Sequence, residues 1–190
     1  MTRSYTLKRR AEQQADTRRR IVEAAVGLHG TIGPAQTSLS MIAERAGVQR
    51  HTLYAHFPDE RSLFVACSGL VEERDPLPQA APWRDIADRS ARIRTGLSAV
   101  YDWYGRNASL VAAVLRDGEH HALTRETSER RFGPPMAQWR EVLAAGLSNK
   151  QYALLALALS FHTWRTLAGE AGLETAAAVE AMVEAIEQAQ

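Results

Sequence analysis

Residues 38–57 read SLSMIAERAGVQRHTLYAHF, and this stretch determines the fold expected around it. Apolar residues recur at helical spacing between Leu39 and Ala46, which predicts a short amphipathic helix. Ser38 stands where a side chain can cap the first turn of that helix. Gly47 stands directly after it, where a positive φ angle ends a helix at low cost. The pattern therefore predicts an eight-residue helix followed by a tight turn.

A second short helix is predicted after the turn, over residues 49–57. Leu53 and Phe57 lie one turn apart on it and would be buried against the first helix. Two short amphipathic helices joined in this way form a helix-turn-helix. The residues left on the exposed side are Gln49, Arg50, His51, Tyr54 and Ala55, with Thr52 and His56 at its edges.

The exposed side of the second helix carries the chemistry that DNA recognition needs. Arginine and glutamine can bond purine edges in the major groove, and hydroxyl and imidazole groups can hold phosphates. Short two-helix units also occur in proteins that do not bind DNA, and there such a face is only solvated. The basic helix that precedes the motif favours the DNA-binding interpretation.

The net charge of +1 hides an asymmetry along the chain. Residues 1–58 carry nine Arg and Lys against four Asp and Glu, whereas residues 59–190 carry 14 against 18. Only the amino-terminal part therefore suits a polyanion. Its polar residues 1–15 are predicted to form a flexible basic arm. Residues 16–29 are predicted to form a helix, and one of the arginines at 18–20 is expected to touch a phosphate.

Motifs on both sides of the turn match a known pattern in order. They are Ser38, Ile42-Ala43, Ala46-Gly47-Val48, Thr52-Leu53-Tyr54, His56-Phe57 and Leu63-Phe64. Together they resemble the signature of the tetracycline-repressor (TetR) family of bacterial regulators. The resemblance implies an all-helical homodimer with an amino-terminal DNA-binding domain of three helices. It also implies a larger carboxy-terminal domain that binds a small inducer and forms the dimer.

The resemblance assigns three side chains to the major groove, namely Gln49, Arg50 and His51, with Arg50 as the candidate for guanine contact. His51 departs from the small residue that is usual at its position, so it adds a contact or alters the approach of the helix. Glu60 stands where the family often has a basic residue. Arg61 compensates for it, or DNA affinity at this point is weaker.

The remaining DNA-binding assignments concern phosphates. The resemblance implies that Ser38 holds a phosphate at the start of the first helix of the motif. Thr52, Tyr54 and His56 would contact the phosphate backbone. Two alternatives stay open, since Tyr54 can instead pack against the preceding helix and His56 can make a structural hydrogen bond.

Beyond the DNA-binding domain at 16–58, residues 59–75 are predicted to form a connecting helix capped by Asp59. The proline-rich stretch 75–82 is the clearest break, and residues 76–190 are assigned to a ligand-binding and dimerisation domain. Its predicted helices cover 83–105, 107–117, 119–131, 136–147, 150–168 and 173–188. No segment alternates with period two over a useful length, so the predicted fold class is all-α.

The second domain is rich in large aromatic residues, which would line an apolar pocket for the inducer or fill a core. The candidates for ligand contact are Trp103, Trp139, Phe161 and Trp164. His120, or alternatively His121, is a candidate for a hydrogen bond to the ligand. His120 and His121 point about 100° apart on a helix, with no acidic or histidine partner one turn on, so no metal site is predicted.

The helix predicted over 150–168 is apolar nearly all round, and the one over 173–188 has a stripe formed by Val179, Met182, Val183 and Ile186. These two helices from each subunit would form a four-helix dimer interface, unless packing within one chain buries them. A two-fold dimer predicts a palindromic operator on double-stranded DNA.

Other classes of protein are disfavoured. No nucleophile elbow, phosphate loop or metal triad is present, so no catalytic residue and no cofactor are predicted. The longest apolar run is half of a membrane span, and no apolar signal core begins the chain, so a cytoplasmic location is expected. Cys67 reads as a buried small residue. The prediction is a repressor released by an apolar ligand, and the alternative is a DNA-binding regulator without an inducer.

Overall fold

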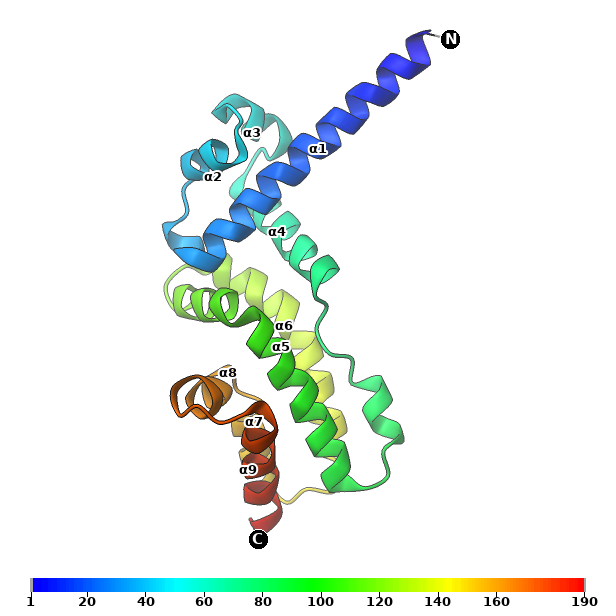
Figure 1. Cartoon of the computed structure of the whole chain (residues 1–190), viewed down its shortest axis with the longest axis vertical. Coiled ribbons are helices and arrows are strands. Elements are labelled where there is room, and N and C mark those ends of the chain that lie inside the picture. The colour runs from blue at the N-terminus through cyan, green and yellow to red at the C-terminus, as the bar shows by residue number, and fades with distance from the viewer. Residues whose placement is uncertain (1, 190) are drawn as a thin grey trace. The chain divides into compact units, whose positions relative to one another are not determined.

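The computed structural model describes residues 2–189, and over these residues it contains helices and no strand (Figure 1). The predicted all-α class is confirmed. The elements are α1 (Thr2–Thr31), η1 (Pro34–Gln36), α2 (Leu39–Ala46), α3 (Arg50–His56), α4 (Glu60–Arg74), η2 (Ala81–Asp85), α5 (Arg89–Gly118), α6 (Ala122–Leu143), α7 (Asn149–Ala158), α8 (Phe161–Trp164), the π-helical η3 (Arg165–Glu170) and α9 (Thr175–Gln188).

The chain forms two compact units. The first comprises the residues up to 76 together with 112–129, and the second comprises 77–111 together with the residues from 130 onward. The sequence assigned residues 76–190 to the carboxy-terminal domain. The structure instead places residues 112–129 of that range in the first unit. Helices α5 and α6 each contribute residues to both units.

The core of the first unit is built on the carboxy-terminal half of α1. Helices α2, α3 and α4 all contact α1, and Figure 1 shows α2 and α3 beside it. The buried apolar residues are Ile21, Val22, Ala24, Ala25 and Leu28 from α1, Ile42, Ala43 and Ala46 from α2, Leu53 and Phe57 at α3, and Leu63 and Cys67 from α4. Burial raises the pKa of the Cys67 thiol to about 12, so this cysteine is a buried small residue as predicted.

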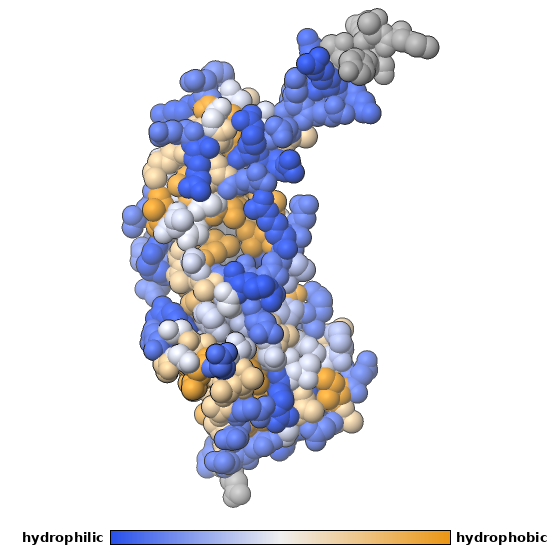
Figure 2. Space-filling model, in the orientation of Figure 1, coloured by the Kyte–Doolittle hydropathy of each residue, from blue (hydrophilic) through white to orange (hydrophobic). Residues whose placement is uncertain are grey.

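Helix α1 begins at Thr2 and not near Asp16, so residues 2–15, expected to be a flexible arm, are helical. Residues 7–16 are exposed, and Figure 2 shows mainly hydrophilic side chains on the coloured part of this stretch. The polar composition of this segment predicts a flexible arm, because it offers few apolar side chains that could pack. It contains no glycine or proline, however, and its Lys, Arg, Glu, Gln and Ala residues are good helix formers.

The end of α5 is attached to the loop that follows α1. The buried Asp117 carboxylate accepts hydrogen bonds from the Ala35 backbone N–H at 2.9 Å and from Arg116 Nε at 2.7 Å. Arg116 also donates to the Ile32 carbonyl. Desolvation would raise the pKa of Asp117, but the hydrogen bonds from Arg116 and Ala35 hold it below its usual value. These bonds explain why 112–129 belongs to the first unit.

A histidine of α1 lies in the same region. The ring of His29 lies 5.2 Å from that of Phe64, which lies 5.9 Å from that of His121. His29 is 5% exposed, and this burial lowers its pKa to about 4. Repulsion from His121 lowers the pKa further, whereas attraction to Asp117 partly opposes the shift. His29 is therefore neutral at pH 7.

The helix boundaries of the second unit differ from the predicted ones. Helix α5 continues through Asn107, whose side chain donates to the Trp103 carbonyl within the helix. Helix α6 continues through Pro134 and Pro135, where the sequence predicted a break. A proline removes a hydrogen-bond donor but its φ angle suits a helix, so packing beyond the proline can preserve the element. The buried Leu143 near the end of α6 provides such packing.

The helix predicted over 150–168 is interrupted at residues 159–160. The Tyr101 hydroxyl donates to the Ala158 carbonyl at 3.0 Å, and the Tyr104 hydroxyl donates to the Leu159 carbonyl at 2.8 Å. Ser160 then caps α8 by accepting from the His162 N–H. Two carbonyl groups left by the interruption are thus bonded by side chains of α5.

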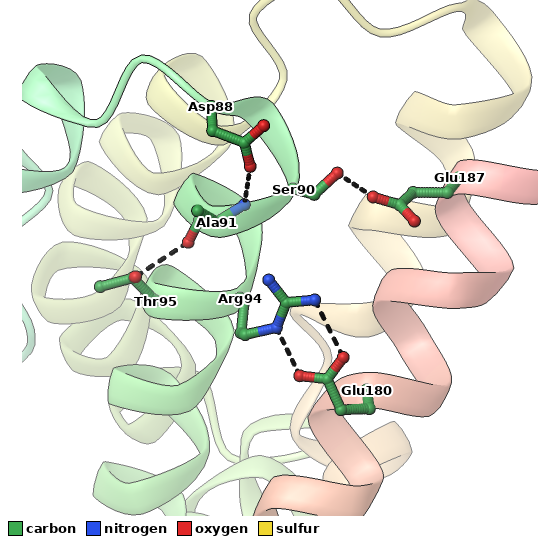
Figure 3. Close-up of polar contacts among 7 residues, drawn as sticks. All are labelled: Asp88, Ser90, Ala91, Arg94, Thr95, Glu180 and Glu187. Carbon is green, nitrogen blue, oxygen red and sulfur yellow. Dashed lines mark hydrogen bonds and ion pairs between the residues drawn. The ribbon is translucent and has the colours of Figure 1, made fainter.

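Polar contacts attach α9 to the first turns of α5 in the second unit (Figure 3). Asp88 caps α5 by accepting from the Ala91 N–H at 2.7 Å. Arg94 forms a two-bond ion pair with Glu180, and Ser90 donates to Glu187. The hydrogen bond from Arg94 lowers the pKa of Glu180.

Neutral His29 makes stability depend on pH. The unfolded chain takes up a proton below about pH 6.5, whereas folded His29 takes one up only near pH 4, so acid favours unfolding between these values. Lowering the pH from 7 to 5 should cost roughly 2 kcal/mol of unfolding free energy through this residue. His29→Phe keeps a ring beside Phe64 and should remove that part of the dependence. Urea denaturation of both proteins at the two pH values measures it, and equal losses would contradict the assignment.

Candidate nucleic-acid interface

The first helix of the motif has the predicted ends. Ser38 has extended backbone angles and its hydroxyl accepts a hydrogen bond from the Met41 N–H at 3.2 Å. Gly47 has a φ angle of 65° and a ψ angle of 39°, the left-handed conformation, and its N–H reaches the carbonyls of Ala43 and Glu44. The predicted cap and the predicted glycine turn are both present.

The second helix, α3, buries one side and exposes the other. Leu53 and Phe57 are each 1% exposed, and their burial contributes roughly 1.5–3 kcal/mol each to folding. On the opposite side, the exposed residues are Gln49, Arg50, His51, Tyr54 and Ala55, and the half-buried residues at its edges are Thr52 and His56. The structure thus brings together on one face the residues that the sequence placed there.

Within this face, Arg50 and Tyr54 are neighbours. Arg50 Nη2 lies 3.4 Å from the Tyr54 hydroxyl, one helical turn away. Tyr54 is 43% exposed, so a large part of its side chain is open to solvent. The face therefore offers a guanidinium group, a phenol and an amide that can all donate hydrogen bonds outward.

The arginines at 18–20 have different environments. Arg18 Nη1 donates to the His56 carbonyl, and Arg20 Nη1 donates to the Ala46 carbonyl. Arg19 has a 68% exposed side chain and forms an ion pair with Asp16. The contacts of Arg18 and Arg20 could not be predicted from local sequence, because their partners are backbone carbonyls 38 and 26 residues away.

Arg61, the predicted substitute for a basic residue at Glu60, is already engaged. Its guanidinium donates two hydrogen bonds to the Glu126 carboxylate of α6, and these bonds raise the pKa of Arg61. Asp59 caps α4 as predicted, accepting from the Ser62 N–H at 2.6 Å. Arg61 thus joins α4 to segment 112–129 of the same unit.

The predicted ligand residues divide between the two units. Trp103, Trp139, Phe161 and Trp164 are all buried in the second unit, whereas His120 is exposed in the first. The neighbouring candidate, His121, is half-buried, and its Nδ1 lies 2.6 Å from the Thr124 hydroxyl.

The four buried aromatic side chains are already packed against protein. Phe161 lies 5.3 Å from Trp164 between ring centroids, and Trp103 lies 5.8 Å from Phe132. Trp139 donates to the Pro78 carbonyl at 2.8 Å. A cavity of about 210 Å³ in the second unit is lined by Arg84, Arg92, Glu141, Val142 and Ala145 instead. A ligand among the aromatic residues would therefore have to displace them.

The helices predicted to form a dimer also pack within the chain. Helix α9 contacts α7 and buries its stripe of Val179, Met182, Val183 and Ile186. Helix α7 keeps apolar side chains exposed, with Tyr152 at 47% and Leu157 at 53%. Packing within one chain thus explains the stripe of α9 but leaves apolar surface on α7.

Two features are absent from residues 2–189. No group of three or more His, Cys, Asp or Glu side chains in this part of the chain could hold a metal ion. No helix there has the length and apolar composition needed to cross a membrane.

Comparisons with known proteins agree on one family. The model of the "Bacterial regulatory proteins, tetR family" matches residues 21–67, which cover the buried half of α1, the helix-turn-helix and half of α4. The HTH-type transcriptional regulator TtgR of Pseudomonas putida is 35% identical over 97 residues. That match spans 50% of this chain and 46% of TtgR, about half the length of the relative.

Other matches extend further along the chain. An uncharacterised HTH-type transcriptional regulator of Mycobacterium tuberculosis is 33% identical over 141 residues, 74% of this chain and 70% of that protein. A crystal structure of a TetR-like transcriptional regulator from Rhodococcus has the same fold, with a TM-score of 0.65 at 18% identity over 90% of this chain and 94% of that one. The relatives are transcriptional regulators and not enzymes. This chain therefore belongs to the tetR family of bacterial regulatory proteins.

Proposed function

We propose that the chain is a sequence-specific DNA-binding transcriptional repressor that a small, largely apolar ligand releases from its operator. The observation that carries the proposal is the exposed face of α3, where Gln49, Arg50, His51 and Tyr54 stand together opposite a buried apolar side. A helix of seven residues is about 10 Å long and fits a major groove about 12 Å wide. Membership of the tetR family supports the same role.

In this proposal the groups on α3 divide by chemistry. Arg50 presents the guanidinium fork that matches guanine O6 and N7, and Gln49 and His51 lie beside it at the start of the helix. Thr52, Tyr54 and His56 hold phosphates, together with the Ser38 hydroxyl at the start of α2. The Ser38 oxygen already accepts a bond from the Met41 N–H, so its own hydrogen remains to be donated to a phosphate oxygen.

The proposed active form is a homodimer that binds a palindromic operator. Two copies place two α3 helices in successive major grooves when their centres lie about 34 Å apart. The surface proposed for dimerisation includes α7, because Tyr152 and Leu157 are exposed there, and extends to α9. Burying such side chains in a two-fold interface removes apolar surface from water.

Release by a ligand needs a physical connection to the DNA-binding helices. Helices α5 and α6 supply it, because each has residues in both units. Asp117 of α5 bonds the loop after α1, and Glu126 of α6 bonds Arg61 near the start of α4. A ligand that moves these helices changes the position of α4 and hence the separation of the two α3 helices in the dimer. A 100-fold loss of DNA affinity corresponds to about 2.7 kcal/mol of coupling.

One observation favours a second candidate function, a regulator without an inducer. The proposed ligand residues are almost fully buried within the protein, with Trp103 and Trp139 each 1% exposed. In that case they form only a core, and DNA affinity is regulated by another signal or by the amount of protein.

The DNA-binding proposal is tested by selecting duplexes from a random library at about 0.15 M salt, followed by anisotropy titration. We expect an inverted repeat bound by a dimer at nanomolar concentration. Arg50→Ala should cost roughly 1–3 kcal/mol on that duplex and relax one base preference. Arg130→Ala removes an exposed arginine of the second unit and is the matched control. An unchanged affinity for Arg50→Ala would refute its assignment, and no enriched sequence would refute the function.

Two variants separate the cap from the phosphate contact of Ser38. Ser38→Ala removes the cap and should lower the unfolding free energy by about 1 kcal/mol. Ser38→Asp keeps an oxygen that caps α2 but places a negative charge beside the DNA, so stability should stay near that of the unchanged protein while DNA affinity falls further than in Ser38→Ala. Thermal unfolding and anisotropy measure the two properties. Undiminished binding by Ser38→Asp would remove Ser38 from the interface.

The ligand proposal predicts a change in tryptophan fluorescence. Flat apolar compounds that insert beside Phe161 and Trp164 should quench or shift the emission and release the selected duplex over the same concentration range. Trp164→Phe should reduce the optical change, whereas Trp83→Phe, at a buried tryptophan of the same unit that is not a proposed ligand contact, is the control. If no compound in a broad panel alters either emission or DNA affinity, the regulator without an inducer is favoured.

A further inference from the structure

Helix α3 has few internal means of keeping its orientation. It contains seven residues, and only Leu53 within it is buried, with Phe57 buried directly after its end. No side chain caps its amino terminus, where Gln49 has extended backbone angles. Two apolar contacts on one side hold a short helix against its neighbours but leave rotation about those contacts possible.

Arg18 of α1 contacts the carboxy-terminal end of α3. Its Nη1 donates a hydrogen bond to the His56 carbonyl at 3.0 Å, and its Cζ lies 4.1 Å from the centre of the Phe57 ring. His56 is the last residue of α3, so its carbonyl lies at the negative end of the helix dipole. One guanidinium group therefore bonds the helix terminus and stacks on the ring that anchors the helix.

The neighbouring arginines Arg19 and Arg20 differ from Arg18 in the groups that they contact. Arg20 makes a similar bond to the last carbonyl of the other helix, with Nη1 at 3.1 Å from the Ala46 oxygen of α2. Arg19, between them, has a 68% exposed side chain and an ion pair with Asp16 at 3.8 Å. Arg18 and Arg19 thus have the same charge and the same helix but differ in their contact with α3.

We propose that Arg18 is a positioning residue that fixes the orientation of α3 and thereby determines how strongly the protein discriminates between DNA sequences. The proposal rests on the DNA-binding function proposed above. Without Arg18, the His56 carbonyl and the Phe57 ring face water, and α3 keeps its two apolar contacts but loses its fixed angle. Contacts to base edges depend on that angle, whereas attraction to phosphates does not.

The test compares Arg18→Ala with Arg19→Ala, which removes the same charge one residue away. Affinity is measured by anisotropy for the selected duplex and for a scrambled duplex, over a range of salt concentrations and well below each unfolding midpoint. Arg18→Ala should lower the ratio of the two affinities at least tenfold and leave the slope against salt unchanged. Arg19→Ala should leave the ratio unchanged, and its slope falls by about 1 if Arg19 touches a phosphate.

Arg18→Lys separates positioning from charge. Lysine keeps the positive charge but has no planar fork to bond a carbonyl and stack on a ring together, so it should not restore the affinity ratio. Amide hydrogen exchange gives a readout without DNA. The Phe57 amide, bonded to the Leu53 carbonyl, should exchange several-fold faster in Arg18→Ala than in Arg19→Ala, while the Ile42 amide of α2 is unchanged.

Three results would overturn the proposal. They are equal affinity ratios in Arg18→Ala and Arg19→Ala, full recovery of the ratio in Arg18→Lys, and unchanged exchange at Phe57. Failure of the proposed function is distinguishable from these, because the unchanged protein would then show no preference for any duplex. In that case the exchange experiment alone still decides whether Arg18 orients α3.

Discussion

The buried side of α1, with Ile21, Ala25 and Leu28, is the constraint on which the first unit depends. Helices α2 and α3 have eight and seven residues and are too short to be stable alone. They exist because this one apolar surface supports both of them and α4. The two sides of α1 therefore have different roles. One side packs against α2, α3 and α4, and the other side faces water.

The same support explains how a small motif can present so many polar groups. Four exposed polar side chains come from positions 49 to 54, and their backbone is supported by the buried residues Leu53 and Phe57 on the opposite side of α3. The left-handed conformation of Gly47 ends α2 and lets the chain turn toward α3. The arrangement is a rigid scaffold with exchangeable surface residues, so base preference can change without a change of fold.

The site was predictable from the sequence where the signals were local. Ser38 and Gly47 define the ends of α2 through hydrogen bonds to their own neighbours, and the period of Leu53 and Phe57 defines the two sides of α3. Hydrogen bonds between residues far apart in the sequence could not be predicted. No local pattern links Arg18 to His56, or Asp117 to Ala35 across 82 residues.

The second unit illustrates the same division. Tyr152 and the following residues read as one continuous apolar helix, and the interruption at residues 159–160 depends on hydroxyls supplied by Tyr101 and Tyr104 of another helix. Conversely, the prolines of α6 read as a terminator, but the element continues into residues that are buried.

Those prolines have a mechanical consequence. Pro134 and Pro135 carry no backbone N–H, so α6 lacks two of its helical hydrogen bonds just after residue 130, where its membership changes from one compact unit to the other. Bending α6 at this point breaks fewer bonds than bending it elsewhere. Helix α6 therefore resists bending least at this point, whereas α5, which also has residues in both units, contains no proline.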